Sequence, residues 1–221
     1  MMMARDFVLD DIPPLKTSDT GLKAIAWMEE FKVSHLPIIN DEDYLGLITE
    51  DDVYRNNMPE EALGAHGLSL QKPFVRAEDH FLEVIRCFQE WELTLLPILD
   101  EQGKYMGCIT LSNLMQGMAR LKGVNEPGAV LVLQVLDRDY SLGQMAQLVE
   151  SNDAKVLSVS VMGVPDSSEL EVHLKINRTD LSAIVATFVR FNYNVAGTFQ
   201  AQRDSNLDDR FGLLMRYLDM D

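Results

Sequence analysis

A segment of about 50 residues occurs twice in this chain, and this duplication restricts the fold more than any single motif does. Leu36-Pro37-Ile38-Ile39 in the first copy matches Leu96-Pro97-Ile98-Leu99 in the second, and Gly46-Leu47-Ile48-Thr49 matches Gly107-Cys108-Ile109-Thr110. A repeat of this length cannot bury its own apolar face. The two copies are therefore expected to pack together about a pseudo-two-fold axis, with binding sites between them.

Both copies predict the same order of helix, strand, strand and helix. Asp19 and Asp79 are the predicted N-caps of helices with apolar residues every three positions. Acidic turns join the two strands of each copy, as in a β-hairpin. The strands are predicted at residues 36–39, 44–49, 96–99 and 105–110. A second helix is expected to begin near Thr49 and near Thr110.

The pattern changes after Pro127-Gly128, which is predicted to end the last helix of the second copy and to mark a domain boundary. From Val130 it becomes strand, helix, strand, strand, helix, strand, the order of a ferredoxin-like βαββαβ domain. Ser141 and Gln144 are the predicted capping box of its first helix. Beyond residue 200 a predicted C-terminal helix has one apolar stripe, which must dock on something: Leu207, Phe211, Leu214 and Leu218.

Composition excludes several classes of function. The net charge of -16, with 35 acidic and 19 basic side chains, argues against nucleic acid and against anionic membranes as partners. Cys87 and Cys108 lie in apolar surroundings without metal-ligand spacing, which predicts buried, reduced thiols. The chain has no signal peptide pattern and no apolar run long enough to span a bilayer, so a cytoplasmic location is expected.

The paired Leu-Pro-Ile and Gly-x-Ile-Thr motifs resemble those of the cystathionine-β-synthase (CBS) domain. Tandem pairs of this domain form adenosyl-binding Bateman modules. The second half resembles an ACT-like regulatory domain, and this order is similar to that of the acetoin-utilisation accessory proteins. ACT domains that bind amino acids have a Pro-Gly turn after their first strand, which residues 137–141 lack. The resemblance therefore implies dimerisation or docking by this domain.

Together the pattern and the resemblance divide the chain into six parts. They are an N-terminal segment (1–10), CBS 1 (11–57), a connector (58–70), CBS 2 (71–122), the ACT-like domain (129–200) and a C-terminal amphipathic helix (201–221).

The resemblance also implies a binding site in the first copy. In this family the Asp of Gly-x-Ile-Thr-x-x-Asp accepts hydrogen bonds from the two ribose hydroxyls, and the Thr hydroxyl lies beside the same ligand. Thr49 and Asp52 carry these roles here, the backbone of Leu36, Pro37 and Ile38 would face the base, and His35 would contact a phosphate. A second interpretation remains open, because Thr-x-x-acid is also a capping motif for the following helix.

The second copy departs from this pattern. Asn113 replaces the aspartate and Leu95 replaces the histidine, so one charge and one polar group are lost. Its corresponding site, with Thr110, Leu96 and Ile98, is predicted to be degenerate or selective for an uncharged ligand. We therefore expect one functional site per chain.

Three classes of function compete. The sequence favours a regulatory module that binds an adenine nucleotide or adenosyl compound, with a homodimer as the expected assembly. The alternative is a ligand-free interaction module. An enzyme ranks last, because no set of acid, base and nucleophile is visible, and no metal is expected.

Overall fold

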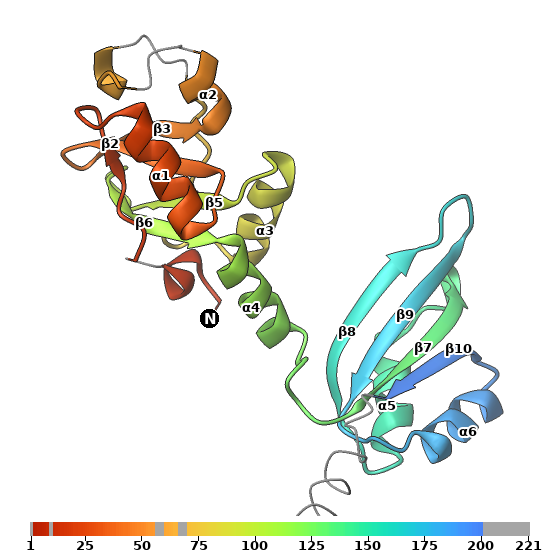
Figure 1. The fold of residues 1–221 in the computed structure, drawn as a ribbon. Coiled ribbons are helices and arrows are strands. Elements are labelled where there is room, and N and C mark those ends of the chain that lie inside the picture. The colour runs from red at the N-terminus through yellow and green to blue at the C-terminus, as the bar shows by residue number, and fades with distance from the viewer. Residues whose placement is uncertain (1, 9–10, 56–59, 66–69, 201–221) are drawn as a thin grey trace, which may run out of the picture. The chain divides into compact units, whose positions relative to one another are not determined.

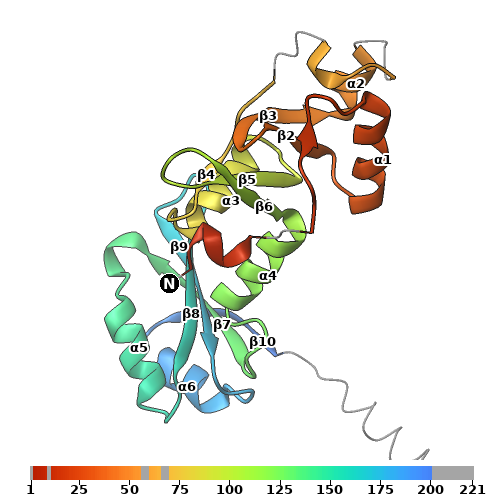
Figure 2. The same ribbon diagram turned by 90° about the vertical axis from the view of Figure 1, so that its left-hand side faces the viewer.

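The computed structural model describes residues 2–8, 11–55, 60–65 and 70–200 (Figures 1 and 2). The chain divides into two compact units, Met1–Met118 and Ala119–Asp221. The elements of the first unit, in chain order, are η1 (Ala4–Phe7), β1 (Leu15–Lys16), α1 (Gly21–Phe31), β2 (His35–Asn40), β3 (Asp43–Thr49), α2 (Glu50–Arg55), η2 (Leu63–Ala65), β4 (Val75–Arg76), α3 (Phe81–Glu90), β5 (Leu95–Leu99) and β6 (Tyr105–Thr110), and α4 (Leu111–Leu121) begins within it.

Each copy of the repeat forms its own three-stranded sheet, in the order β1-β2-β3 or β4-β5-β6. The predicted hairpins are confirmed, with Leu36 opposite Ile48 in the first and Leu96 opposite Ile109 in the second. The short parallel strands β1 and β4 were not predicted. Two residues of strand are too few to give a periodic signal.

The predicted N-caps of the first helix in each copy are wrong by one residue. Thr20 caps α1 and His80 caps α3. Asp19 and Asp79 instead accept the backbone N–H three residues before them, at 2.8 and 2.7 Å. An Asp that closes a tight turn with its own carboxylate is no longer available as the cap, so the next side chain takes that position.

Each copy is completed by the segment that precedes the other copy. Near the N-terminus, the N–H of Ala4 donates to the carbonyl of Asp79 at 2.8 Å, and the Phe7 and Phe81 rings lie 4.5 Å apart. In the same way the N–H of Leu63 donates to the carbonyl of Asp19 at 2.8 Å. The N-terminal segment and the connector therefore contribute directly to the packing of the pair.

The last helix of the second copy ends earlier than predicted. Helix α4 stops at Leu121, well before Pro127. Gly123 adopts a positive φ of 61°, and the N–H of Val124 reaches back to the carbonyl of Ala119 at 2.9 Å. This left-handed glycine ends the helix, so the proline is not needed to stop it.

The second unit is built on a four-stranded antiparallel sheet in the order β10-β7-β9-β8. Its elements are β7 (Ala129–Leu136), η3 (Asp137–Asp139), α5 (Leu142–Glu150), β8 (Val156–Gly163), β9 (Glu169–Ile176), α6 (Ser182–Arg190) and β10 (Asn194–Gln200). Ser141 caps α5 by accepting the Gln144 N–H at 3.3 Å, as predicted. The expected ferredoxin-like order is confirmed.

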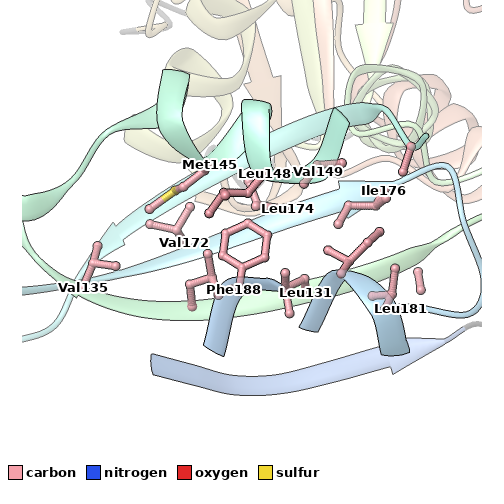
Figure 3. Close-up of a cluster of buried hydrophobic side chains, with 14 residues drawn as sticks. Leu131, Val135, Met145, Leu148, Val149, Val172, Leu174, Ile176, Leu181 and Phe188 are labelled. Atoms are coloured by element: carbon pink, nitrogen blue, oxygen red, sulfur yellow. The ribbon is translucent and has the colours of Figure 1, made fainter. Parts of the chain in front are cut away.

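The core of this unit lies between one face of the sheet and helices α5 and α6 (Figure 3). Phe188 from α6 is fully buried in the middle of the cluster, among side chains that include Leu131, Val172 and Leu174. Strand residues that alternate with these face the other way. Because α5 and α6 both use the same face, the opposite face is not covered by either helix.

Candidate functional site

A hollow of about 250 Å³ lies where β3 ends and α2 begins, in the first unit. Both copies contribute to it. It is lined by His35, Leu47, Thr49, Asp51, Asp52, Arg55, Gln71 and Leu93. The structure thus brings three of the predicted site residues together, namely His35, Thr49 and Asp52.

Thr49 and Asp52 form a complete capping box at the start of α2. The Asp52 carboxylate accepts the Thr49 backbone N–H at 3.0 Å and the Thr49 hydroxyl at 2.7 Å. The Thr49 hydroxyl oxygen in turn accepts the Asp52 N–H at 3.2 Å. The capping interpretation is therefore confirmed. These hydrogen bonds hold both side chains at the wall of the hollow without the help of a ligand.

The second copy makes the same box with a neutral side chain. The Asn113 amide oxygen accepts the Thr110 N–H at 3.2 Å and the Thr110 hydroxyl at 2.6 Å, and the Asn113 N–H donates to the Thr110 hydroxyl oxygen at 3.3 Å. Asparagine is thus a sufficient cap at this position. The cap alone does not require the negative charge of Asp52.

His35 joins the two copies at the edge of the hollow. Its Nδ1 lies 3.0 Å from the Thr94 hydroxyl oxygen and accepts the Thr94 N–H at 3.4 Å, which assigns the proton of the neutral ring to Nε2. Burial lowers the pKa of His35, and the nearby Asp52 carboxylate opposes that shift without reversing it. The imidazole is therefore neutral at pH 7, and its Nε2–H is a hydrogen-bond donor rather than a positive charge.

Leu36, Pro37 and Ile38 do not line this hollow. All three are buried in β2, where Leu36 is opposite Ile48 and Ile38 is opposite both Leu15 and Gly46. In the second copy Leu96 and Ile98 are likewise fully buried. These residues shape the sheets next to the predicted sites.

Five lining residues were not predicted as site residues from the sequence: Leu47, Asp51, Arg55, Gln71 and Leu93. Leu47 and Arg55 follow from the local motif, since they belong to β3 and to the last turn of α2. Gln71 and Leu93 come from distant parts of the chain, and Gln71 is held there because its carbonyl accepts the Leu47 N–H at 2.9 Å. The sequence carries no local signal for such a contact.

The charged groups at the hollow are mostly acidic. Arg55 is the cation among its lining residues, and its guanidinium is 3.8 Å from the Asp51 carboxylate with both side chains largely exposed. An exposed pair of this kind is screened by water and salt. Two carboxylates and one arginine therefore disfavour a highly charged anion.

The duplicated hairpins, the exchanged leading segments and the capped hollow between the copies define a tandem module of the βαββα type. Residues 4–58 and 69–120 match the family model described as CBS domain. The N-terminal half of the chain is therefore a tandem pair of CBS domains.

Two curated proteins match about half of this chain. Homoserine O-acetyltransferase of Methanococcus vannielii is 26% identical over 102 residues, which is 44% of this chain and 21% of that protein. Inosine-5'-monophosphate dehydrogenase of Methanocaldococcus jannaschii is 27% identical over 115 residues, 51% of this chain and 23% of that protein. The chain thus spans less than a quarter of the length of these two curated relatives.

Solved structures with a similar fold include a CBS domain pair/ACT domain protein from Thermotoga maritima. It is 19% identical, with a TM-score of 0.48, and the match covers 54% of this chain and 98% of that one. CBSX2 in complex with AMP is 21% identical, with a TM-score of 0.47, and covers 55% and 99%. No helix among the described residues is long and apolar enough to cross a membrane.

Proposed function

We propose that this protein is a regulatory sensor whose CBS pair binds an adenine nucleoside or a nucleotide of low charge. The ligand occupies the hollow beside the Thr49–Asp52 box. Other CBS pairs bind adenine nucleotides, AMP in one solved structure and ATP in another. The ACT-like unit would dimerise or transmit the signal, and we propose no catalytic role for the chain.

One observation carries this proposal. The two copies use the same box for the same structural purpose, yet only the first has a carboxylate there. Since Asn113 shows that an amide is a sufficient cap, the box itself does not require the negative charge of Asp52. A carboxylate can accept hydrogen bonds from both hydroxyls of a ribose, which is the role that the family resemblance implies.

The size and charge of the hollow support a small ligand of low charge. Its volume of about 250 Å³ lies just below the ~300–1,000 Å³ usual for drug-sized ligands. His35 is neutral, and Asp51 and Asp52 outnumber Arg55. We therefore propose that adenosine or AMP binds more tightly than metal-free ATP.

Asp52→Asn is expected to separate ligand binding from capping. The amide should keep all three hydrogen bonds of the box, so the melting temperature without ligand should be unchanged within about 2 °C. The loss of charge-assisted hydrogen bonds, roughly 1.5–3 kcal/mol, should weaken AMP binding tenfold or more. The measurement is a thermal shift titration with adenosine, AMP and metal-free ATP, followed by calorimetry.

Asn113→Asp is the matched control, because it makes the reciprocal change in the same box of the other copy. It should leave the affinity of the first site unchanged. Unaltered AMP affinity in Asp52→Asn would refute the ribose role of this carboxylate. If none of the three ligands shifts the wild-type melting temperature, the ligand-free interaction module is the better account.

We also propose that the protein is a homodimer associated through helix faces of the CBS pair. Leu82 on α3 and Leu111 and Met115 on α4 are 57%, 46% and 61% exposed. Exposed apolar side chains on neighbouring helices mark surfaces that associate. Light scattering should give about twice the chain mass of 25.0 kDa. A mass of one chain at tens of micromolar would contradict the dimer, and Met115→Glu, placed in this patch, should lower the mass.

A further inference from the structure

The open face of the ACT-like sheet has a broad hollow of about 570 Å³. It lies on the side away from α5 and α6, and all its lining residues belong to the second unit. Strands β7, β8, β9 and β10 all contribute. Residues that shape it include Val130, Ser160, Met162, His173, Lys175 and Phe199.

Large apolar side chains lie exposed around this hollow. Val124 is 63% exposed, Met162 50% and Phe199 63%. The Phe199 ring leans over Gly197, where an added Cβ would lie 3.3 Å from the ring. The Phe199 ring therefore lies along the face of the sheet. Apolar side chains gathered on one concave face mark a surface that is normally covered.

The lining is basic, although the chain as a whole is strongly acidic. Among the residues that the structure describes, Lys122 and Lys175 line the hollow and no Asp or Glu does. The Lys122 ammonium donates to the Ser160 hydroxyl at 2.8 Å. The Glu171 carboxylate lies 2.6 Å from Nε2 of His173, and Glu171 does not line the hollow. In a chain of net charge -16, this face therefore suits an apolar partner with acidic flanks.

A segment of that kind follows directly in the chain. Strand β10 ends at Gln200, and both Phe199 and Gln200 line the hollow, so the described part of the chain ends at its rim. Residues 201–221 lie outside the described part of the structure. Their sequence has five Asp and three Arg, together with the apolar stripe Leu207, Phe211, Leu214 and Leu218.

We propose that residues 201–221 dock as an amphipathic helix on the open face of the sheet of the same chain, with the apolar stripe in this hollow. From Leu207 to Leu218 a helix rises about 16 Å, and four strands span about 14 Å, so the stripe matches the width of the sheet. Residues 201–206 reach up to about 20 Å, enough to turn back onto the face. Docking within one chain also needs no association of two molecules.

Residues 201–221 need an apolar surface to pack on, and the open face of the sheet needs a cover. Gly212 and the short length would leave an isolated helix marginal in water, so its apolar stripe needs a packed surface. Asp208 and Asp209 follow Leu207 directly and suit the lysines at the rim. The docked helix would give the sheet a second cover, opposite α5 and α6.

Disulfide trapping in the full-length protein tests this proposal. Ser160→Cys is placed in the hollow and combined with Leu214→Cys on the stripe. The control combines Ser160→Cys with Arg216→Cys, which lies about 160° away from position 214 around the helix axis. The native thiols of Cys87 and Cys108 are buried. We expect an intramolecular disulfide in the first pair to form at least tenfold faster than in the control.

Two results would overturn the proposal. Equal rates for the two pairs would mean that the stripe does not face the hollow. A disulfide that joins two chains, at a rate that rises with concentration, would show that a second copy supplies the helix. Non-reducing electrophoresis distinguishes the intramolecular product from the dimer.

A chain that ends at Gln200 provides an independent measurement. With Ser160→Cys as the probe, removal of residues 201–221 should raise the reaction rate with a thiol reagent at least fivefold. The control probe Ser182→Cys, at the start of α6, should react equally in both chains. Unchanged reactivity at position 160 would contradict docking, whereas protection restored by an added peptide of residues 201–221 would support it.

Discussion

Phe188→Ala is expected to lower the free energy of unfolding of the second unit by about 3–5 kcal/mol. The Phe188 side chain is fully buried at the centre of the cluster in Figure 3, and its ring packs edge-on against Tyr193 at 5.3 Å. Alanine would leave a cavity that the sheet on one side and α5 on the other cannot close. A loss of this size is a large part of the stability of a small domain.

Val189→Ala on the same helix is the matched control. Its side chain is 56% exposed, so the change should stay within about 0.5 kcal/mol. Urea unfolding followed by circular dichroism would measure both variants, with the transition of the second unit fitted separately. If Phe188→Ala unfolds like Val189→Ala, the centre of this core has been placed wrongly.

The sequence predicted most of the local structure because duplication tests each pattern twice. Both hairpins, the helices after Thr49 and Thr110, and the βαββαβ order of the second half occur as expected. Periodicity and turn chemistry determine such elements from neighbouring residues alone.

The errors arose where two local signals competed. At each copy's first helix, an Asp and the residue after it can both cap, and the turn before the helix takes the Asp. At the end of α4, Gly123 stops the helix before Pro127 can. In both cases the residue nearer the helix, with a suitable conformation, caps or ends it. Residue preferences alone do not decide between two such neighbours.

Contacts across long sequence distances could not be predicted. The exchange of leading segments joins Ala4 with Asp79 and Leu63 with Asp19, and the pattern of apolar residues gives no sign of it. The same holds for Gln71 and Leu93 at the candidate site. The motif identified Thr49 and Asp52. Only the hydrogen bonds of the two boxes show that a carboxylate and a neutral amide can both form this cap.

Gly128→Ala is expected to destabilise the second unit by about 3 kcal/mol or more, although glycine at this position was predicted only to mark a boundary. Gly128 has a φ of 153°, which L-residues rarely adopt. A Cβ there would lie 2.0 Å from the carbonyl oxygen of Ile176. That oxygen belongs to the backbone of β9, which pairs with β7 at the next residue, Ala129. It cannot move away without opening the ladder between the two central strands.

Gly143→Ala in helix α5 is the control, because nothing lies within 4 Å of the added Cβ and alanine favours a helix. This variant should be as stable as the wild type or more stable by up to about 1 kcal/mol. Opposite signs for the two substitutions in urea unfolding are the expected result. Equal stability of Gly128→Ala and the wild type would mean that the chain enters β7 by another path, and the rim of the open-face hollow, which Gly128 lines, would then have a different shape.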